Sequence, residues 1–123
     1  MIKVESVSKR FGGVHAVNNT SIEIAKGSIT GLIGPNGAGK STTLHSIFGL
    51  TDIRSGQIAF QGENITGLKP HRIVHKGLAF VPQERSIFPS LTVLENLEMG
   101  AYSRNDKDGI QKDLEWVFEI LPR

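Results

Sequence analysis

Short runs that alternate apolar and polar side chains occur near the start of the chain, and a period of two is typical of half-buried β-strands. One such run covers residues 2–6, and a second covers residues 20–24, after a turn that the asparagines at 18–19 predict. A third run, at residues 57–60, ends at a glycine-containing turn. The first two runs predict that the sheet begins with an antiparallel section, and the third predicts a further strand.

Two continuous apolar runs, residues 28–33 and 77–81, do not alternate. Parallel strands that are covered on both faces need no alternation, so each run predicts a buried strand. The antiparallel strands and these two buried strands together predict an α/β fold with a mixed sheet.

Four segments carry helical spacing or helix-start signals. Thr92 and Glu95 form a capping box, which marks the beginning of one helix. A polar linker at residues 103–109 separates that helix from the last apolar stripe. The predicted helices are residues 40–48, residues 70–76, a segment after Thr92, and a segment from about residue 110 to residue 121.

The turn after the first apolar run matches the phosphate-binding pattern G-x-x-x-x-G-K-[ST]. Glycines let the backbone wrap around phosphates, and the N-terminus of the next helix adds positive potential. Lys40 is expected to reach the β- and γ-phosphates, and the Ser41 hydroxyl is expected to ligate Mg²⁺. The predicted nucleotide-binding residues of this loop are Gly34, Pro35, Asn36, Gly37, Ala38, Gly39, Lys40, Ser41 and Thr42.

Three positions outside the loop are further candidates. Phe11 precedes a glycine pair, so its ring either packs into the core or offers a face to a flat base. Gln83 follows the second apolar run, and ligands of open α/β sheets bind beyond the carboxyl ends of strands. It is therefore expected to face the glycine loop, orient water and contact the Mg²⁺ shell. His71 and His75 have a spacing that can hold zinc, but without cysteine or a nearby third ligand we favour a solvated helix face.

Composition narrows the class of protein. The 123 residues suffice for one domain, and 38% hydrophobic and 21% charged residues are typical of a soluble globular chain. A net charge of +2 is too small to favour nucleic acid as a partner. The absence of cysteine excludes disulfides and thiolate chemistry. The charged N-terminus predicts no signal peptide, and no apolar run approaches the length of a membrane span.

The sequence resembles the ATP-binding subunits of ABC transporters over essentially its full length. Phe11 with the glycine after it, the loop at 34–42 and the segment at 81–84 are similar to three motifs of that family. The segment at 87–97 resembles the start of the family's helical subdomain, and its amino-acid sequence is most similar to that of bacterial importers of branched-chain amino acids. The resemblance implies a P-loop NTPase fold, with a nucleotide-binding core at 1–86 and the beginning of a helical subdomain at 87–123.

The same resemblance implies a function and partners. Phe11 would stack on adenine, and Gln83 would act near the metal and the attacking water as the catalytic residue. ATP and Mg²⁺ would be the cofactors, and a second ABC ATPase subunit would complete the site. The subunit would lie on the cytoplasmic face of the inner membrane and contact an integral-membrane permease near residues 83–97. No nucleic acid partner is expected.

One departure from the family pattern limits what this chain is expected to do alone. The L-S-G-G-Q signature, the acidic strand end and the switch histidine of the family are absent from the sequence. The chain is thus expected to hold the N-terminal part of a domain whose full-length form hydrolyses ATP, and to be inactive by itself. Two alternatives stay open: a soluble ABC-type ATPase that acts on ribosomes or DNA, and a non-catalytic nucleotide-binding or docking fragment.

Overall fold

The computed structural model describes every residue except 85 and 122–123. Contacts divide the chain into two compact units, Met1–Phe80 and Val81–Arg123, each of which is described by itself. The division of the domain after residue 86 stays a prediction.

The first unit contains a four-stranded sheet in the order β2-β1-β3-β4, in which every neighbouring pair is antiparallel. The strands are β1 (Ile2–Phe11), β2 (Val14–Ile24), β3 (Ser55–Phe60) and β4 (Glu63–Asn64). The central strand β1 forms a long hairpin with β2, whose register places Ile2 opposite Ile24 and Phe11 opposite Val14. The predicted antiparallel section is confirmed.

The turn predicted at the asparagine pair is wrong, because β2 runs through it. Asn19 adopts a left-handed backbone conformation with φ 48°, which asparagine tolerates better than most residues. Its N–H donates to the hydroxyl of Ser8 on the facing strand at 2.9 Å. The irregular register between Val7 and Lys9 thus takes up the asparagines within the hairpin instead of ending it.

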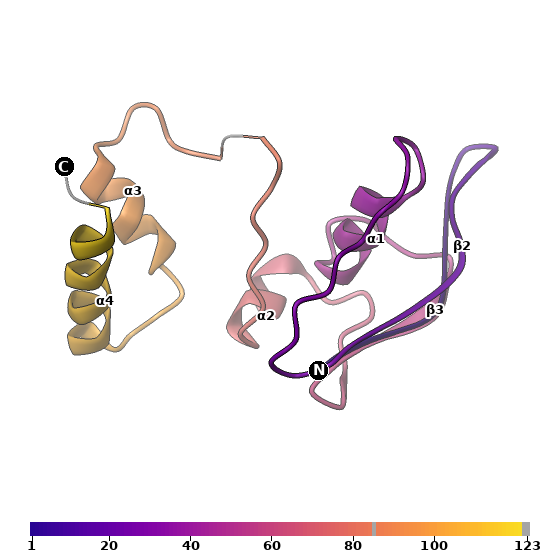
Figure 1. Ribbon diagram of the computed structural model, residues 1–123, viewed down its shortest axis with the longest axis horizontal. Coiled ribbons are helices and arrows are strands. Elements are labelled where there is room, and N and C mark those ends of the chain that lie inside the picture. The colour runs from indigo at the N-terminus through magenta and orange to yellow at the C-terminus, as the bar shows by residue number, and fades with distance from the viewer. Residues whose placement is uncertain (85, 122–123) are drawn as a thin grey trace. The chain divides into compact units, whose positions relative to one another are not determined.

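Two helices, α1 (Lys40–Ile47) and α2 (Pro70–His75), lie on the same side of this sheet (Figure 1). The apolar face of the sheet and these helices enclose one core, because the alternating strand residues and the helical stripes point toward each other. The buried hydrophobic residues are Val4, Val7, Val17, Ile47, Phe48, Ile58, Ile65, Ile73 and Leu78.

The two apolar runs predicted as parallel strands are not strands in the structure. Residues 28–33 have no regular secondary structure and lie on the surface, with Ile29 and Ile33 almost fully exposed. At residues 77–81 only Leu78 and Phe80 turn inward, where the Phe80 ring lies 5.1 Å from that of Phe48. A strand requires a neighbouring strand for its N–H and C=O groups. Among the described residues, the strand pairings involve only β1, β2, β3 and β4.

The second unit contains α3 (Val93–Gly100) and α4 (Lys107–Ile120). The predicted capping box is present at the start of α3: Thr92 and Glu95 each accept from the other's backbone N–H, at 3.3 and 2.7 Å. Helix α4 begins earlier than the predicted position near residue 110. The predicted polar linker is correspondingly shorter.

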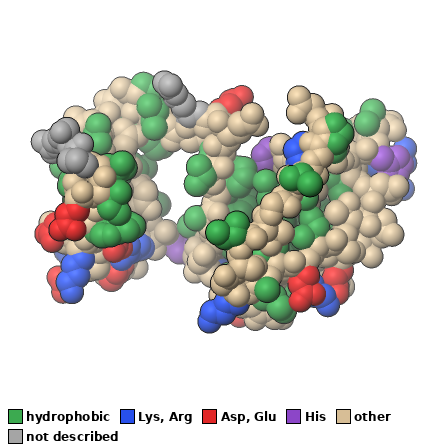
Figure 2. Space-filling model, viewed as in Figure 1, with side chains coloured by type: hydrophobic (Ala, Val, Ile, Leu, Met, Phe, Trp, Pro, Cys, Tyr) green, Lys and Arg blue, Asp and Glu red, His purple; other side chains and the backbone are tan. Residues whose placement is uncertain are grey.

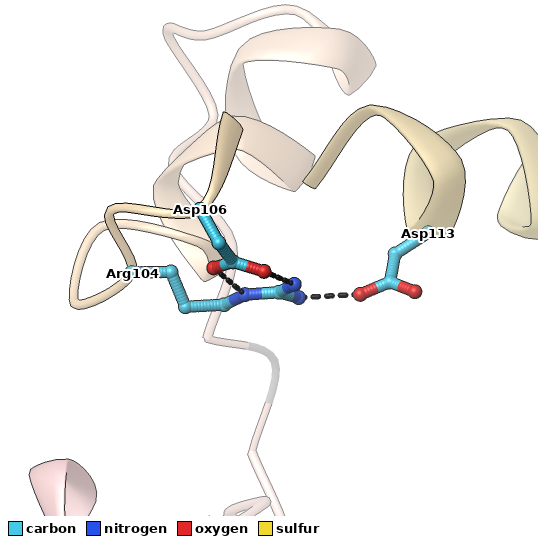
Figure 3. A network of polar contacts seen from close by, with 3 residues as sticks. All are labelled: Arg104, Asp106 and Asp113. Carbon is cyan, nitrogen blue, oxygen red and sulfur yellow. Dashed lines mark hydrogen bonds and ion pairs between the residues drawn. The ribbon is translucent and has the colours of Figure 1, made fainter. Parts of the chain in front are cut away.

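A polar network accompanies the start of α4 (Figure 3). The Arg104 guanidinium donates two hydrogen bonds to Asp106, at 2.9 and 2.6 Å, and a third to Asp113 on the helix. The guanidinium hydrogen bonds lower the pKa of the Asp106 carboxyl, and the two carboxylates raise the pKa of Arg104.

None of the described helices, of which α4 is the longest, has the length and hydropathy that a bilayer crossing requires.

Candidate functional site: the glycine loop before α1

The glycine loop folds back onto its own lysine. The ammonium Nζ of Lys40 donates hydrogen bonds to the carbonyl oxygens of Gly34 at 2.7 Å and Pro35 at 2.8 Å. The N–H of Ala38 also donates to the Pro35 carbonyl, at 3.2 Å. The loop therefore encloses a fixed positive charge.

Gly39 joins this loop to the sheet. It has φ 86°, a left-handed conformation that favours glycine. A Cβ atom at this position would lie only 2.2 Å from the carbonyl oxygen of Ala16 and 3.3 Å from the Val17 side chain, both on β2. A glycine is needed here for the backbone angle and for the close approach to the strand.

The first turn of α1 carries backbone donors that no described side chain caps. Gly39 occupies the N-cap position and has no side chain to bond the N–H groups of the first turn, which also contains no acidic residue. Uncapped N–H groups and the helix dipole together attract anions. The backbone N–H and hydroxyl of Thr43 both donate to the Gly39 carbonyl, at 2.8 and 2.9 Å, which holds this turn in place.

The sequence-predicted loop residues are brought together as one surface. Lys40 and Thr42 are half-buried, Ser41 is exposed, and residues 34–38 are exposed. The Lys40 ammonium, the exposed Ser41 hydroxyl and the uncapped N–H groups at the start of α1 fit the charge of a triphosphate and the oxygen preference of Mg²⁺. The donor set present is thus suited to a magnesium nucleotide.

Phe11 lies at the end of β1 and is 53% exposed, so its ring is outside the core. The ammonium of Lys9 lies 4.9 Å from the centre of this ring. Sequence analysis missed Lys9, although its separation from Phe11 by two places along a strand indicates a shared face.

Gln83 is exposed and belongs to the second unit, so its predicted role at the loop stays a prediction. His71 and His75 are both exposed on α2. The functional geometry that the structure does describe lies within the first unit.

Comparison of the sequence with known protein families shows which family the chain belongs to. The family model described as "ABC transporter" matches residues 17–121, a range that includes the glycine loop and helices α1 to α4. The chain belongs to the ABC transporter family. The named relatives and solved structures are ATP-binding components of such transporters, which confirms the resemblance inferred from the sequence.

Two relatives of this ABC chain are named for branched-chain amino acid transport. The high-affinity branched-chain amino acid transport ATP-binding protein BraG of Pseudomonas aeruginosa is 42% identical over 123 residues, covering 100% of this chain and 52% of BraG. The protein named "Probable branched-chain amino acid transport ATP-binding protein LivF" of Archaeoglobus fulgidus is 38% identical over 122 residues, covering 99% of this chain and 51% of LivF. The chain thus spans about half the length of these relatives. Other relatives are named for sulfate/thiosulfate import, galactose/methyl galactoside import and lipopolysaccharide export.

Solved structures confirm the P-loop NTPase fold of this ABC chain. The MJ1267 ATP-binding cassette of an ABC transporter superposes with a TM-score of 0.77 at 35% identity, over 85% of this chain and 41% of that one. The MJ0796 cassette, solved as a dimer in a post-hydrolysis state with ADP and Pi, gives 0.76 at 26% identity, over 94% and 55%.

Proposed function

We propose that this chain binds MgATP as part of the ATP-binding subunit of a solute importer. One observation carries the proposal: the Lys40 ammonium is fixed by the Gly34 and Pro35 carbonyls beside the uncapped start of α1. Both features direct positive charge to the place where the family's loop pattern would hold a phosphate chain.

Each residue of the loop has a separate task in this proposal. The phosphate oxygens replace the two carbonyls as acceptors for Lys40, and the N–H groups at the start of α1 donate to them. The Ser41 hydroxyl holds Mg²⁺, which neutralises charge on the phosphates when it is bound. In the full-length subunit, Gln83 orients the attacking water. Phe11, which is exposed, stacks on the base.

Removal of the loop cation tests the binding proposal. Lys40→Met keeps the length of the side chain and removes its charge, so we expect MgATP affinity to fall about 10- to 100-fold, the value of charged hydrogen bonds. Lys26→Met is the matched control, because Lys26 is exposed and lies outside the loop. Isothermal titration of the two variants and the wild type provides the measurement. Equal weakening by both variants, or a wild type without saturable binding, would contradict the proposal.

ATP turnover is proposed for the full-length subunit, and binding without turnover is proposed for this chain. The sequence after Gln83 contains no acidic strand end and no L-S-G-G-Q signature. Phosphoryl transfer depends on positioned charges around the phosphates, so a partial set binds better than it catalyses. Phosphate release at saturating MgATP should match the buffer blank, and release that Lys40→Met abolishes would contradict this.

Branched-chain amino acids are the proposed solute. The proposed partners are a membrane permease and a second ATPase subunit, and the full-length subunit is proposed to lie at the cytoplasmic face of the membrane. The names of BraG and LivF support the solute, whereas the other relatives' names point to different ones. Uptake of labelled leucine by cells that carry the full-length gene with its neighbouring permease genes tests it. Lys40→Met should abolish leucine uptake. Galactose or sulfate uptake in place of leucine would overturn the solute assignment.

A further inference from the structure

The β1–β2 hairpin carries an ammonium against an exposed aromatic ring. Lys9 Nζ lies 4.9 Å from the centroid of Phe11, within the distance of about 6 Å at which a cation is attracted to a ring face. Phe11 nevertheless remains 53% exposed. The cation occupies one face of the ring, and the solvent-exposed area of the ring is left for another flat group.

The same hairpin adjoins the glycine loop. Lys9 is paired with Val17 in the β1–β2 register, and the Val17 side chain lies 3.3 Å from the position of a Cβ on Gly39. All of these residues belong to the first unit. Lys9 thus contacts the Phe11 ring and is also the β-sheet partner of Val17, the residue against which the phosphate loop packs.

We infer that Lys9 is a positioning residue that holds the Phe11 ring for the base of the bound nucleotide. The inference rests on the proposed function, since it assigns a task within the same site. A phenylalanine side chain at a hairpin end loses rotamer freedom when a base stacks on it. A ring that is already held by an ammonium on one face loses less freedom, so stacking on the other face is stronger.

A purely electrostatic role for Lys9 leads to a different expectation. A lysine that only attracts anions would strengthen the binding of any polyphosphate, with or without a base. A lysine that acts through Phe11 would strengthen only the binding of ligands that have a base. Inorganic tripolyphosphate carries the charge of the phosphate chain and no base, so it separates the two roles.

The test is a titration of this chain with MgATP and with magnesium tripolyphosphate. Lys9→Met should weaken MgATP binding about two- to fivefold, the range of an exposed cation–π contact, and leave tripolyphosphate binding unchanged. Lys9→Arg should restore MgATP affinity, because a guanidinium also lies on ring faces. In a Phe11→Leu background, Lys9→Met should have no further effect. Lys3→Met, on the same strand, removes an equal charge from a lysine that is paired with Glu5 and serves as the control.

A second measurement follows the contact without nucleotide. The Lys9 ε-methylene protons should show an upfield ring-current shift in the wild type that is lost in Phe11→Leu. Absence of this shift, or equal weakening of both ligands by Lys9→Met, would overturn the inference and leave the proposed function intact. A wild type that binds neither ligand would overturn both.

Discussion

Gly37 and Gly39 have nearly the same left-handed backbone angle, φ 85° and 86°, but of the two only Gly39 lies against strand β2. An alanine at Gly37 meets no atom within 4 Å, so Gly37→Ala tests backbone strain alone, at about 1–2 kcal/mol. Gly39→Ala adds a clash with the Ala16 carbonyl and should cost at least about 1 kcal/mol more. Urea unfolding of both variants measures the difference.

The comparison also reveals whether the loop depends on the strand. If Gly39→Ala lowers the free energy of unfolding more than Gly37→Ala does, a glycine is needed at position 39 because β2 lies behind it. Equal losses of unfolding free energy in the two variants would show that the Ala16 contact does not constrain the loop. MgATP affinity should follow the same order, because the helix start that binds phosphate begins at Lys40, the next residue.

At the scale of the element, the capping box makes the start of α3 sensitive to acid. The backbone N–H and the hydroxyl of Thr92 lower the pKa of Glu95 from its ordinary value of 4.5. A lowered pKa in the folded state stabilises the helix above the ordinary pKa, and this contribution is lost as pH falls through the lowered value. The helicity of α3 in the wild type should therefore decrease as pH falls below about 4.5.

Glu95→Gln should weaken this pH dependence, because the amide oxygen accepts the same hydrogen bonds but does not titrate. The Thr92 amide resonance followed by NMR from neutral to acidic pH reports the cap directly. Glu98→Gln, on the same helix, provides a control with the same change of charge. An acid transition of α3 that is unchanged in Glu95→Gln would show that another group causes it.

Local signals in the sequence predicted the elements whose causes are local. Thr92 and Glu95 lie three residues apart and bond each other, so the start of α3 can be predicted from the sequence. The glycine loop and α1 are likewise defined by neighbouring residues. An apolar run such as residues 28–33 shows only that a strand is favoured, because its partner strand is not encoded in the run itself. The Lys9 contact with Phe11 was missed because the first strand was predicted only over residues 2–6, whereas β1 continues to Phe11 and places both side chains on one strand.

At the scale of the whole molecule, the unpaired apolar segment at 28–33 should determine how the chain behaves in solution. Ile29 and Ile33 are 103% and 92% exposed, and Figure 2 shows hydrophobic side chains at the surface over the first unit. An exposed apolar segment that is not paired within a sheet is a template on which another chain can add a strand. We therefore expect association that increases with protein concentration.

Paired substitution of this segment tests the expectation. Ile29→Lys with Ile33→Lys removes apolar surface and adds charge, so the sedimentation coefficient should become independent of concentration. Val74→Lys is the control: Val74 is 42% exposed, but its backbone groups lie within α2 and cannot pair with a strand. If Val74→Lys reduces association as much as the double variant, general hydrophobicity rather than strand pairing drives it. If the double variant associates like the wild type, residues 28–33 are not the contact surface.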